Sequence, residues 1–507
     1  MSIHHRIALL TLIVAGASVR VTGLFANTFH ADEALFASWA RLISVWSDPL
    51  LSAQAVDKPP LLFYLQALLF PLFGAEDWVA RLPGWIASLL LIPLSARLAM
   101  SLYRSEVVAV STAVFVTLSP LLIQFSPTAF IDPLLATLLV GALWAAAAQS
   151  ARRAAPPHRQ KKRSYAAATV SGILFGLALA SKYQALLFFP LIMALALIGH
   201  WRRSQLWRWV LGFIAVVGSV LIWDIARSGG FSLWSVQMSS YGGLRLAWSW
   251  ELWPRLVDWV QQWGYLLHAR PTGFASALVL LPVLVSLIGL QGKGQLLDRA
   301  IAVFLVAYFA LHWLVAIPVW ERYVVPTVPL VGLLLARWLV RLVSLWAGRV
   351  TDSVSAKGEL QSLYWLVPLF LFLLQGSSAV MAREGRLPVG GRPSADGSAA
   401  ELATSLDDAP YGTVLYDHWF SWQWRYHLLD SRVYVSWFPD PVALVEDLTV
   451  FGREGPGRFV AVPDGPESLP VLRALREARY HMLPVEPSSE DDFTRAIRLY
   501  RIIPNGR

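Results

Sequence analysis

Long apolar runs alternate with short polar breaks along the first 380 residues. A helix that crosses a bilayer needs about 20 mainly apolar residues. The pattern predicts about eleven such helices by that criterion, over residues 6–25, 78–101, 106–124, 130–150, 165–182, 184–200, 209–226, 272–290, 300–318, 323–342 and 363–381. The apolar run 59–74 is short and opens with two prolines, so we interpret it as a re-entrant or partly embedded segment.

Residues 33–46 show a different periodicity. Leu35, Trp39, Leu42 and Trp46 follow helical spacing, whereas the polar residues of this stretch lie away from that stripe. The pattern indicates an amphipathic helix that lies on the outer leaflet of the membrane. Asp32 and Glu33 would stand at its first turn.

The tail changes character after a linker rich in Gly, Pro and Ser. Strand-like and helix-like segments alternate there, which predicts a small α/β domain. We therefore expect two domains, residues 1–382 in the membrane and residues 383–507 outside it. The predicted fold class is mainly α, a polytopic membrane protein with a small C-terminal extracytoplasmic α/β domain. No glycine-rich phosphate loop, His/Cys metal spacing or fixed-period repeat is present in the sequence.

Composition supports this assignment. Of the residues, 56% are hydrophobic and 15% are charged, whereas a soluble protein has about 25% charged residues. The 24 Trp and 15 Tyr suit a membrane–water boundary. The chain has no cysteine, which excludes disulfides, thiolate metal sites and cysteine nucleophiles. The first apolar segment could be a signal peptide ending near "AGA" at 15–17, but we favour a retained span.

The net charge of +9 does not indicate nucleic acid, because the basic residues form short clusters between apolar runs. The densest cluster, residues 151–164, should be cytoplasmic. Counting spans from it places the N-terminus inside and every other basic cluster, including Lys293, inside as well. The predicted location is the plasma (inner) membrane. Residues 26–77, 125–130, 227–271 and 319–322, together with the tail, then lie outside.

This threading gathers charged residues at one membrane face: Asp32, Glu33, Asp57, Lys58, Arg81, Asp132, Lys182 and Arg322. Each has a structural interpretation. Asp32 and Asp132 could cap helices, and Glu33 could complement a helix dipole. Lys58 and Arg81 could extend to the interface. Lys182 interrupts an apolar stretch, so it marks a tight turn or faces a polar cavity.

Together these residues suit a phosphate carried by a lipid. Lys or Arg would hold the phosphate, and a carboxylate could remove a proton from an acceptor hydroxyl. If the phosphate is the leaving group, the cations also stabilise the charge that develops on it.

Six segments in order carry a family resemblance: "DEALFASWA" (32–40), "DKPPLLFYLQALLFPLFG" (57–74), "WVARLPGWIASLLLIPL" (78–94), "FIDPLLA" (130–136), "SKYQALLFFPL" (181–191) and "ERYVVPTVPL" (321–330). The chain resembles the GT-C superfamily of polyprenyl-phosphate-sugar glycosyltransferases, in the branch of protein O-mannosyltransferases and the lipid A aminoarabinose transferase. The resemblance is strongest in the first 200 residues and loose in the tail.

The resemblance implies roles for individual residues. Asp32 would act as general base or orient the acceptor, beside Glu33, and Asp132 would be the Asp of the second outer loop. Lys58 would bind the donor phosphate, and Arg322 with Tyr323 would bind the phosphate and headgroup region. We add Arg81 and Lys182 to the phosphate-binding candidates, although "SKY" lacks the glycine of the related "TKG"-like position.

The sequence also departs from the related family at a possible metal-binding position. Aminoarabinose transferases carry Glu before the lysine, near a possible metal ion, whereas this chain has Asp57. Asp57 could still ligate, and His268 is a further candidate, so a divalent metal ion is left open as a cofactor. An isolated histidine is more often structural or simply exposed.

The leading hypothesis is an inverting glycosyltransferase that moves a sugar from a polyprenyl-phosphate donor to a lipid, glycan or protein acceptor. A transporter or flippase of lipid-linked saccharides and a non-catalytic scaffold are the alternatives, although no paired halves are visible in the sequence. Residues 416–430 crowd aromatics with His418, Arg425 and His427, which suggests either an acceptor subsite or a domain core. The sequence names neither the sugar, the acceptor nor the carrier.

Overall fold

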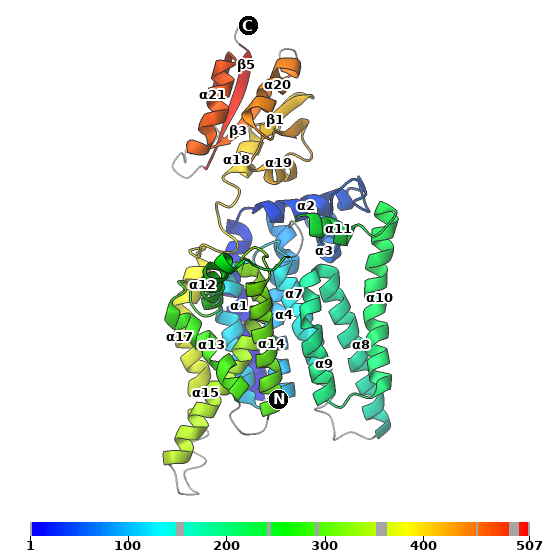
Figure 1. Ribbon diagram of the computed structural model, residues 1–507, viewed down its shortest axis with the longest axis vertical. Coiled ribbons are helices and arrows are strands. Elements are labelled where there is room, and N and C mark those ends of the chain that lie inside the picture. Colours follow the sequence, from blue (N-terminus) through cyan, green and yellow to red (C-terminus); the bar gives the residue numbers. More distant parts are fainter. Residues whose placement is uncertain are drawn as a thin grey trace. The chain divides into compact units, whose positions relative to one another are not determined.

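The computed structural model describes residues 3–148, 157–240, 245–288, 294–350, 362–452, 455–485 and 496–504. Residues 151–156 of the predicted basic loop, and Lys293, lie outside these residues, whereas residues 157–164 belong to helix rather than to a loop. The chain divides into two compact units, and each is treated separately below (Figure 1). The first comprises residues 1–25 and 43–390, and the second comprises residues 26–42 and 391–507.

The first unit is helical. Its longer helices are α1 (Ile3–Ala26), α4 (Asp77–Tyr103), α8 (Pro157–Ser181), α10 (Arg203–Ser228), α14 (Gln295–Leu314), α15 (Val328–Val350) and α17 (Leu366–Arg383). Its shorter elements are α3 (Leu61–Phe73), α5 (Glu106–Leu118), α6 (Pro120–Phe125), α7 (Asp132–Ala147), η1 (Tyr183–Phe188), α9 (Phe189–Ile198), α11 (Leu233–Ser240), α12 (Ser249–Gly264), α13 (Gly273–Ile288) and η2 (Glu321–Thr327).

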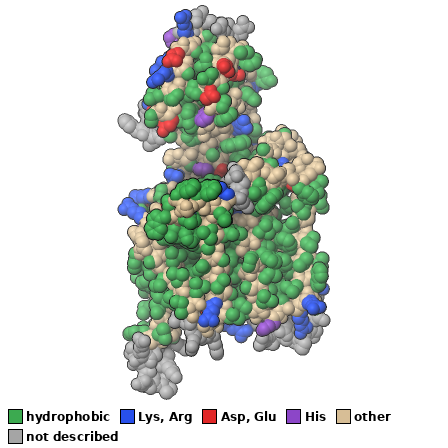
Figure 2. Space-filling view, in the orientation of Figure 1, with side chains coloured by type: hydrophobic (Ala, Val, Ile, Leu, Met, Phe, Trp, Pro, Cys, Tyr) green, Lys and Arg blue, Asp and Glu red, His purple; other side chains and the backbone are tan. Residues whose placement is uncertain are grey.

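Every one of the eleven predicted spans corresponds to helix in this unit. Within the described residues, seven helices are long and apolar enough to cross a membrane, and the spans predicted near 106, 130, 184 and 272 are shorter apolar helices. The segment predicted as re-entrant forms α3. Hydrophobic side chains cover the flanks of these helices on the face seen in Figure 2. The chain is therefore a multi-pass membrane protein.

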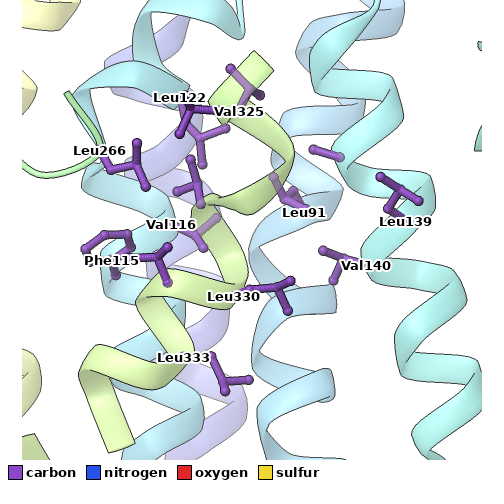
Figure 3. Close-up of a cluster of buried hydrophobic side chains, with 14 of the residues drawn as sticks. Leu91, Phe115, Val116, Leu122, Leu139, Val140, Leu266, Val325, Leu330 and Leu333 are labelled. Carbon is purple, nitrogen blue, oxygen red and sulfur yellow. The ribbon is translucent and has the colours of Figure 1, made fainter. Parts of the chain in front are cut away.

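Helix α5 lies in the core of the first unit, and its few polar side chains, Ser111, Thr112 and Thr117, are buried with the apolar ones. Ser105 caps it by accepting a hydrogen bond from the N–H of Val108 at 3.3 Å. All of its residues from Val108 to Leu118 are buried. Figure 3 shows the cluster around it, with Leu91 of α4, Val140 of α7 and Leu330 of α15 in the same layer as Phe115.

Two interhelical features further define this unit. Helices α8 and α10 approach closely through glycines: a Cβ atom added at Gly172 would lie 2.0 Å from the carbonyl oxygen of Trp209, and one at Gly212 would lie 2.6 Å from that of Thr169. Arg20 of α1 is 1% exposed. Its guanidinium donates to the carbonyls of Val116 and Thr117 at 3.1 and 2.9 Å, where α5 ends. Backbone oxygens thus satisfy this buried charge.

The second unit contains a five-stranded sheet in the order β2-β1-β3-β5-β4. The strands are β1 (Thr413–Asp417), β2 (Val433–Trp437), β3 (Arg458–Pro463), β4 (Tyr480–Pro484) and β5 (Ile497–Pro504). Strand β1 runs parallel to β2 and β3, whereas β5 runs antiparallel to β3 and β4. The predicted small α/β domain is confirmed, but β4 was not predicted as a strand.

Helices cover both faces of this sheet. Leu415 points into a core with α18 (Ala399–Thr404) and α19 (Ser421–His427). Its neighbour Tyr416 points into the opposite core with α20 (Pro441–Phe451) and α21 (Leu469–Glu477). This alternation is what the pleat of a strand requires. The short helix η4 (Pro466–Ser468) precedes α21.

The second unit also contains most of α2 (Ala31–Ser44), so residues 26–42 are grouped with the C-terminal domain. The predicted amphipathic helix is confirmed, although it ends at Ser44 and Trp46 lies beyond it. Phe36 and Trp39 are 4% and 2% exposed. Leu35 and Leu42 of the same stripe are half-buried.

Asp417 at the end of β1 gives this domain a pH-dependent stability. Its carboxylate is fully buried and accepts hydrogen bonds from the Phe420 N–H and the Ser421 hydroxyl, both at 2.8 Å. Burial raises its pKa from 3.8 to about 6, against the effect of these hydrogen bonds. The folded state therefore binds more protons than the unfolded state between these values, and the free energy of unfolding falls as pH rises through them, by up to ~3 kcal/mol.

We expect Asp417→Asn to remove this fall, because an amide keeps the acceptor oxygen without the charge. The variant should be more stable than the wild type at neutral pH and equally stable near pH 4. Urea unfolding can be followed with a dye on a cysteine introduced at the exposed Tyr434. Asp440→Asn, which keeps a cap at the start of α20, is the control and should keep the wild-type pH profile. Identical profiles for Asp417→Asn and the wild type would contradict the prediction.

Candidate functional site

A buried ion pair joins two helix ends in the first unit. Asp132 opens α7, with Pro133 in the first turn, and Lys182 follows the last residue of α8. The Lys182 Nζ lies 2.6 Å from Asp132 Oδ1, and the two residues are 9% and 2% exposed. Such a pair is stable in an apolar surrounding only while both partners are present. The two candidates, 50 residues apart in the chain, therefore form one site.

Further cations and aromatic rings lie around this pair. The Lys182 Nζ is 4.7 Å from the centre of the Tyr323 ring. The Arg322 guanidinium stacks on Trp320 at 4.1 Å and lies 5.4 Å from the Phe130 ring. Arg322 and Lys58 are both close enough for their charges to act on Lys182. Lys58, Lys182 and Arg322 thus bring three positive charges to this region, of which the carboxylates of Asp57 and Asp132 offset two.

Lys58 is itself held by its neighbours. It forms an ion pair with Asp57, and its ammonium donates to Gln237 Oε1 of α11 at 3.1 Å. The side chains of Lys58 and Asp57 are 11% and 17% exposed, so the pair is largely shielded from solvent.

Two polar residues that we did not select from the sequence, Gln184 and Tyr308, form hydrogen bonds next to the site. Gln184 donates its amide to the Tyr308 hydroxyl and to the carbonyl of Tyr323, the latter at 2.9 Å. The Tyr308 hydroxyl donates to the same carbonyl at 2.5 Å. These bonds fix the backbone beside Arg322. The only signal in the sequence is a single Gln and a single Tyr in otherwise apolar segments.

Tyr308 also borders an apolar groove between α9 and α14. The groove has a volume of about 590 Å³ and is lined mainly by Leu, Ala, Val and Pro side chains, including Leu187, Leu191, Val303 and Ala307. Tyr308 thus contacts both the polar cluster and a groove whose lining suits a hydrocarbon chain.

Three predicted site residues, Arg81, Asp32 and Glu33, are not part of the contacts described so far. Arg81 is fully buried in α4, with a nitrogen 3.8 Å from Asp77. Asp32 and Glu33 lie in the second unit, at the first turn of α2, where Glu33 Oε2 accepts a hydrogen bond from the His30 N–H at 3.0 Å. The assignment of all three to the site stays a prediction.

The metal candidates have partners of their own. Asp57 is paired with Lys58, and His268 Nδ1 contacts the backbone of Arg270. In the described parts of the chain, no group of three or more His, Asp or Glu residues could hold a metal ion. Neither Asp57 nor His268 belongs to such a group among the described residues, and we base no chemical step on a metal.

Comparisons with known proteins give a family match for part of the chain. Residues 57–223 match the family described as dolichyl-phosphate-mannose-protein mannosyltransferase. No curated protein sequence matches the chain.

Solved structures give matches over nearly the whole chain. ArnT from Cupriavidus metallidurans, bound to undecaprenyl phosphate, matches with a TM-score of 0.67 at 14% identity, covering 97% of each chain. An oligosaccharyltransferase from Archaeoglobus fulgidus, tethered to an acceptor peptide, matches with a TM-score of 0.57 at 13% identity, covering 90% of this chain and 69% of that chain. A second structure of that oligosaccharyltransferase, a complex with zinc and sulfate, has a TM-score of 0.53 at 13% identity, covering 85% of this chain and 62% of that chain.

These matches confirm the predicted resemblance and fold class, and none of them supports the transporter alternative. The chain therefore shares the fold of ArnT and of this oligosaccharyltransferase, and its residues 57–223 match the family described as dolichyl-phosphate-mannose-protein mannosyltransferase.

Proposed function

We propose that the protein transfers a sugar from a polyprenyl-phosphate donor to an acceptor hydroxyl or phosphate, with inversion at the anomeric carbon. The observation that carries this proposal is the juxtaposition of Lys182, Arg322 and Lys58 with an apolar groove that shares Tyr308. A phosphate with a long hydrocarbon chain needs both features.

The cations would bind the donor phosphate and stabilise it as it leaves. When the bond between the anomeric carbon and the phosphate oxygen breaks, its electron pair stays with the oxygen. Lys58 and Arg322, with Lys182 behind them, would hold the resulting charge in a site with little water. Arg81 is a further candidate for the same phosphate. A phosphate leaving group needs little protonation near neutral pH, so a cationic clamp suffices.

The acceptor needs a base instead. Asp32 would take the proton of the acceptor hydroxyl as its oxygen attacks the anomeric carbon, with Glu33 beside it. Asp132 holds the Lys182 ammonium, and the family resemblance implies a part for it in catalysis. Tyr323 would face the donor headgroup through the ring that covers Lys182.

The α9–α14 groove would take the lipid chain next to the phosphate. We expect Ala307→Trp, which places a large ring in the groove, to weaken the binding of a long-chain polyprenyl phosphate by about 10-fold, because two or more buried CH₂ groups would lose contact at about 0.8 kcal/mol each. A short-chain analogue should bind as before. Leu221→Trp, at an exposed position of α10, is the matched control. Equal losses for both chain lengths would contradict this use of the groove.

The proposal also assigns the two ends of the helical unit to the two sides of the membrane. Asp298 accepts hydrogen bonds or ion pairs from Tyr103, Arg337 and Arg341. It lies ten residues before Tyr308 on α14, about 15 Å along the helix. Under the positive-inside rule this basic end would be cytoplasmic and the Lys182 end extracytoplasmic, in the plasma (inner) membrane.

The test is sugar transfer by Asp32→Asn with a panel of polyprenyl-phosphate-linked sugars and acceptors. The variant should lose about 10²- to 10⁴-fold in kcat while it binds polyprenyl phosphate like the wild type. Asp48→Asn is the control, because Asp48 lies in the same outer segment but caps the backbone at Ser52 and Ala53. Full activity of Asp32→Asn, or transfer with no donor of the panel by the wild type, would overturn the proposal.

A further inference from the structure

The segment that carries Asp32 is built into the C-terminal domain. Residues 26–42 and 391–507 form one compact unit, although more than 340 residues separate them in the chain. We infer that the C-terminal domain positions the proposed catalytic helix α2, and that Arg41, Asp430 and Phe29 are its positioning residues. This inference rests on the proposed function, because it assigns a role to the surroundings of Asp32.

The first attachment precedes α2. The Thr28 N–H donates to the Arg392 carbonyl at 3.1 Å, and its hydroxyl donates to the Pro393 carbonyl at 3.1 Å. The same hydroxyl accepts from the Asp396 N–H at 3.1 Å. Asp396 in turn accepts from the backbone of Ser398 and Ala400, where α18 begins. Thr28 thus supplies hydrogen-bond partners for residues 392–396, which lead into the C-terminal domain.

The second attachment is aromatic. Phe29 is fully buried and meets the Tyr426 ring edge-on, with the centroids 4.8 Å apart. It also stacks near His427 of α19 at 6.3 Å. Tyr426 and Trp424 are themselves 1% and 0% exposed. These two aromatics of residues 416–430 therefore act as core and docking surface, rather than as an open sugar-stacking face.

The third attachment lies near the other end of α2. Arg41 is 7% exposed. Its guanidinium donates to the carbonyl of Tyr426 and to the carboxylate of Asp430, and it lies 5.1 Å from the Tyr426 ring. A bound guanidinium with two directional partners and a ring fixes both the position and the rotation of a helix.

Asp32 and Glu33 lie between these attachments. Phe29, two residues before α2, and Arg41, near its end, both contact Tyr426 of α19. Ala34, Ala37 and Ala40 of the same helix are fully buried. A base must stay within a fraction of an ångström of its working position. The C-terminal domain supplies that rigidity.

A cleavable chain tests the attachment without any activity assay. A protease site is inserted between Pro393 and Ser394, which are exposed, and the full-length protein is cut in detergent. The fragment beginning at Ser394 should stay associated through residues 26–42. In Phe29→Ala/Arg41→Ala it should dissociate at least 10-fold faster, whereas Arg425→Ala, an exposed arginine of the same helix α19, should behave as the wild type. Release of the wild-type fragment on cutting, or equal retention in both variants, would overturn the inference.

A second measurement separates positioning from mere stability. The chain has no cysteine, so a nitroxide on Leu35→Cys labels α2 alone. Arg41→Ala should make this label more mobile and lower kcat by about 10-fold or more with an unchanged KM for the donor, and Arg41→Lys should recover part of both. If the fragment stays bound and Asp32→Asn is fully active, the proposed function fails while the attachment stands. Normal kcat in Arg41→Ala with a mobile label would overturn the positioning role alone.

Discussion

Replacing Lys182 by methionine should abolish most of the sugar transfer and weaken the membrane unit. The substitution removes one cation from the proposed phosphate site, and losing one such group from a site that stabilises developing charge costs about 10²–10³ in kcat. It also leaves the carboxylate of Asp132, 2% exposed, without its partner. An uncompensated buried charge costs about 3–5 kcal/mol of stability. Transfer kinetics and thermal unfolding in detergent measure the two effects.

Three further variants separate these effects. Lys182→Arg keeps the charge and should keep part of the activity. The pair Asp132→Leu/Lys182→Met removes both charges, so stability should return while transfer stays lost. Arg97→Met, at the far end of α4 where Arg97 lies 5.9 Å from the Trp144 ring, controls for the loss of any cation. Wild-type transfer in Lys182→Met would show that this lysine serves the fold only.

Replacing Arg227 by alanine should have the second largest effect on ligand binding and stability, because Arg227 holds the loop before Lys58. Arg227 and Asp224 form an ion pair at 3.1 Å, with both side chains 3% exposed. The Arg227 guanidinium donates to the carbonyls of Leu51, Gln54 and Val56 at 3.2–3.3 Å.

Asp224 completes the same connection. It accepts from the Ser232 N–H at 2.8 Å and from the Leu233 N–H at 3.2 Å, where α11 begins. That helix carries Gln237, the partner of Lys58. One ion pair therefore fixes both segments that hold Lys58.

We expect Arg227→Ala to weaken polyprenyl-phosphate binding by about 10- to 100-fold and to destabilise the unit by about 3 kcal/mol or more, because Asp224 loses its counter-charge. Binding and thermal unfolding can be measured on the same preparation. Arg227→Lys should fall between, since an ammonium cannot reach three carbonyls at once. Arg208→Ala removes an arginine of the same helix that stacks on Tyr165 at 4.6 Å, and it should bind like the wild type. Unchanged binding in Arg227→Ala would show that the loop needs no such support.

The predicted membrane helices follow directly from the physics of the bilayer. Apolar length decides whether a segment can cross, so the runs at 6–25 or 209–226 could be identified without any structure. The tail was predictable for a similar reason, since alternating strand and helix patterns favour a layered α/β domain. Strand β4 was missed because "ARYHMLP" carries few β-branched residues, and its pairing with β5 supplies the preference that its sequence lacks.

The candidate site was predictable only one residue at a time. Asp132 and Lys182 could be selected because charged groups in apolar surroundings need a partner. Their pairing depends on how α7 and α8 pack, which no spacing in the sequence reveals. Gln184, Gln237 and Tyr308 were missed because such residue types are common, and their importance comes from neighbours far away in the chain. Arg227 was treated only as part of an outer loop.

The contact between α8 and α10 limits where a lipid chain can enter the helical unit. With the backbone of α10 so near Gly172 that even a methyl group would collide with it, no acyl or isoprenoid chain can slip between these two helices. The α9–α14 groove is lined by other helices, so a long-chain molecule could occupy it without separating α8 from α10.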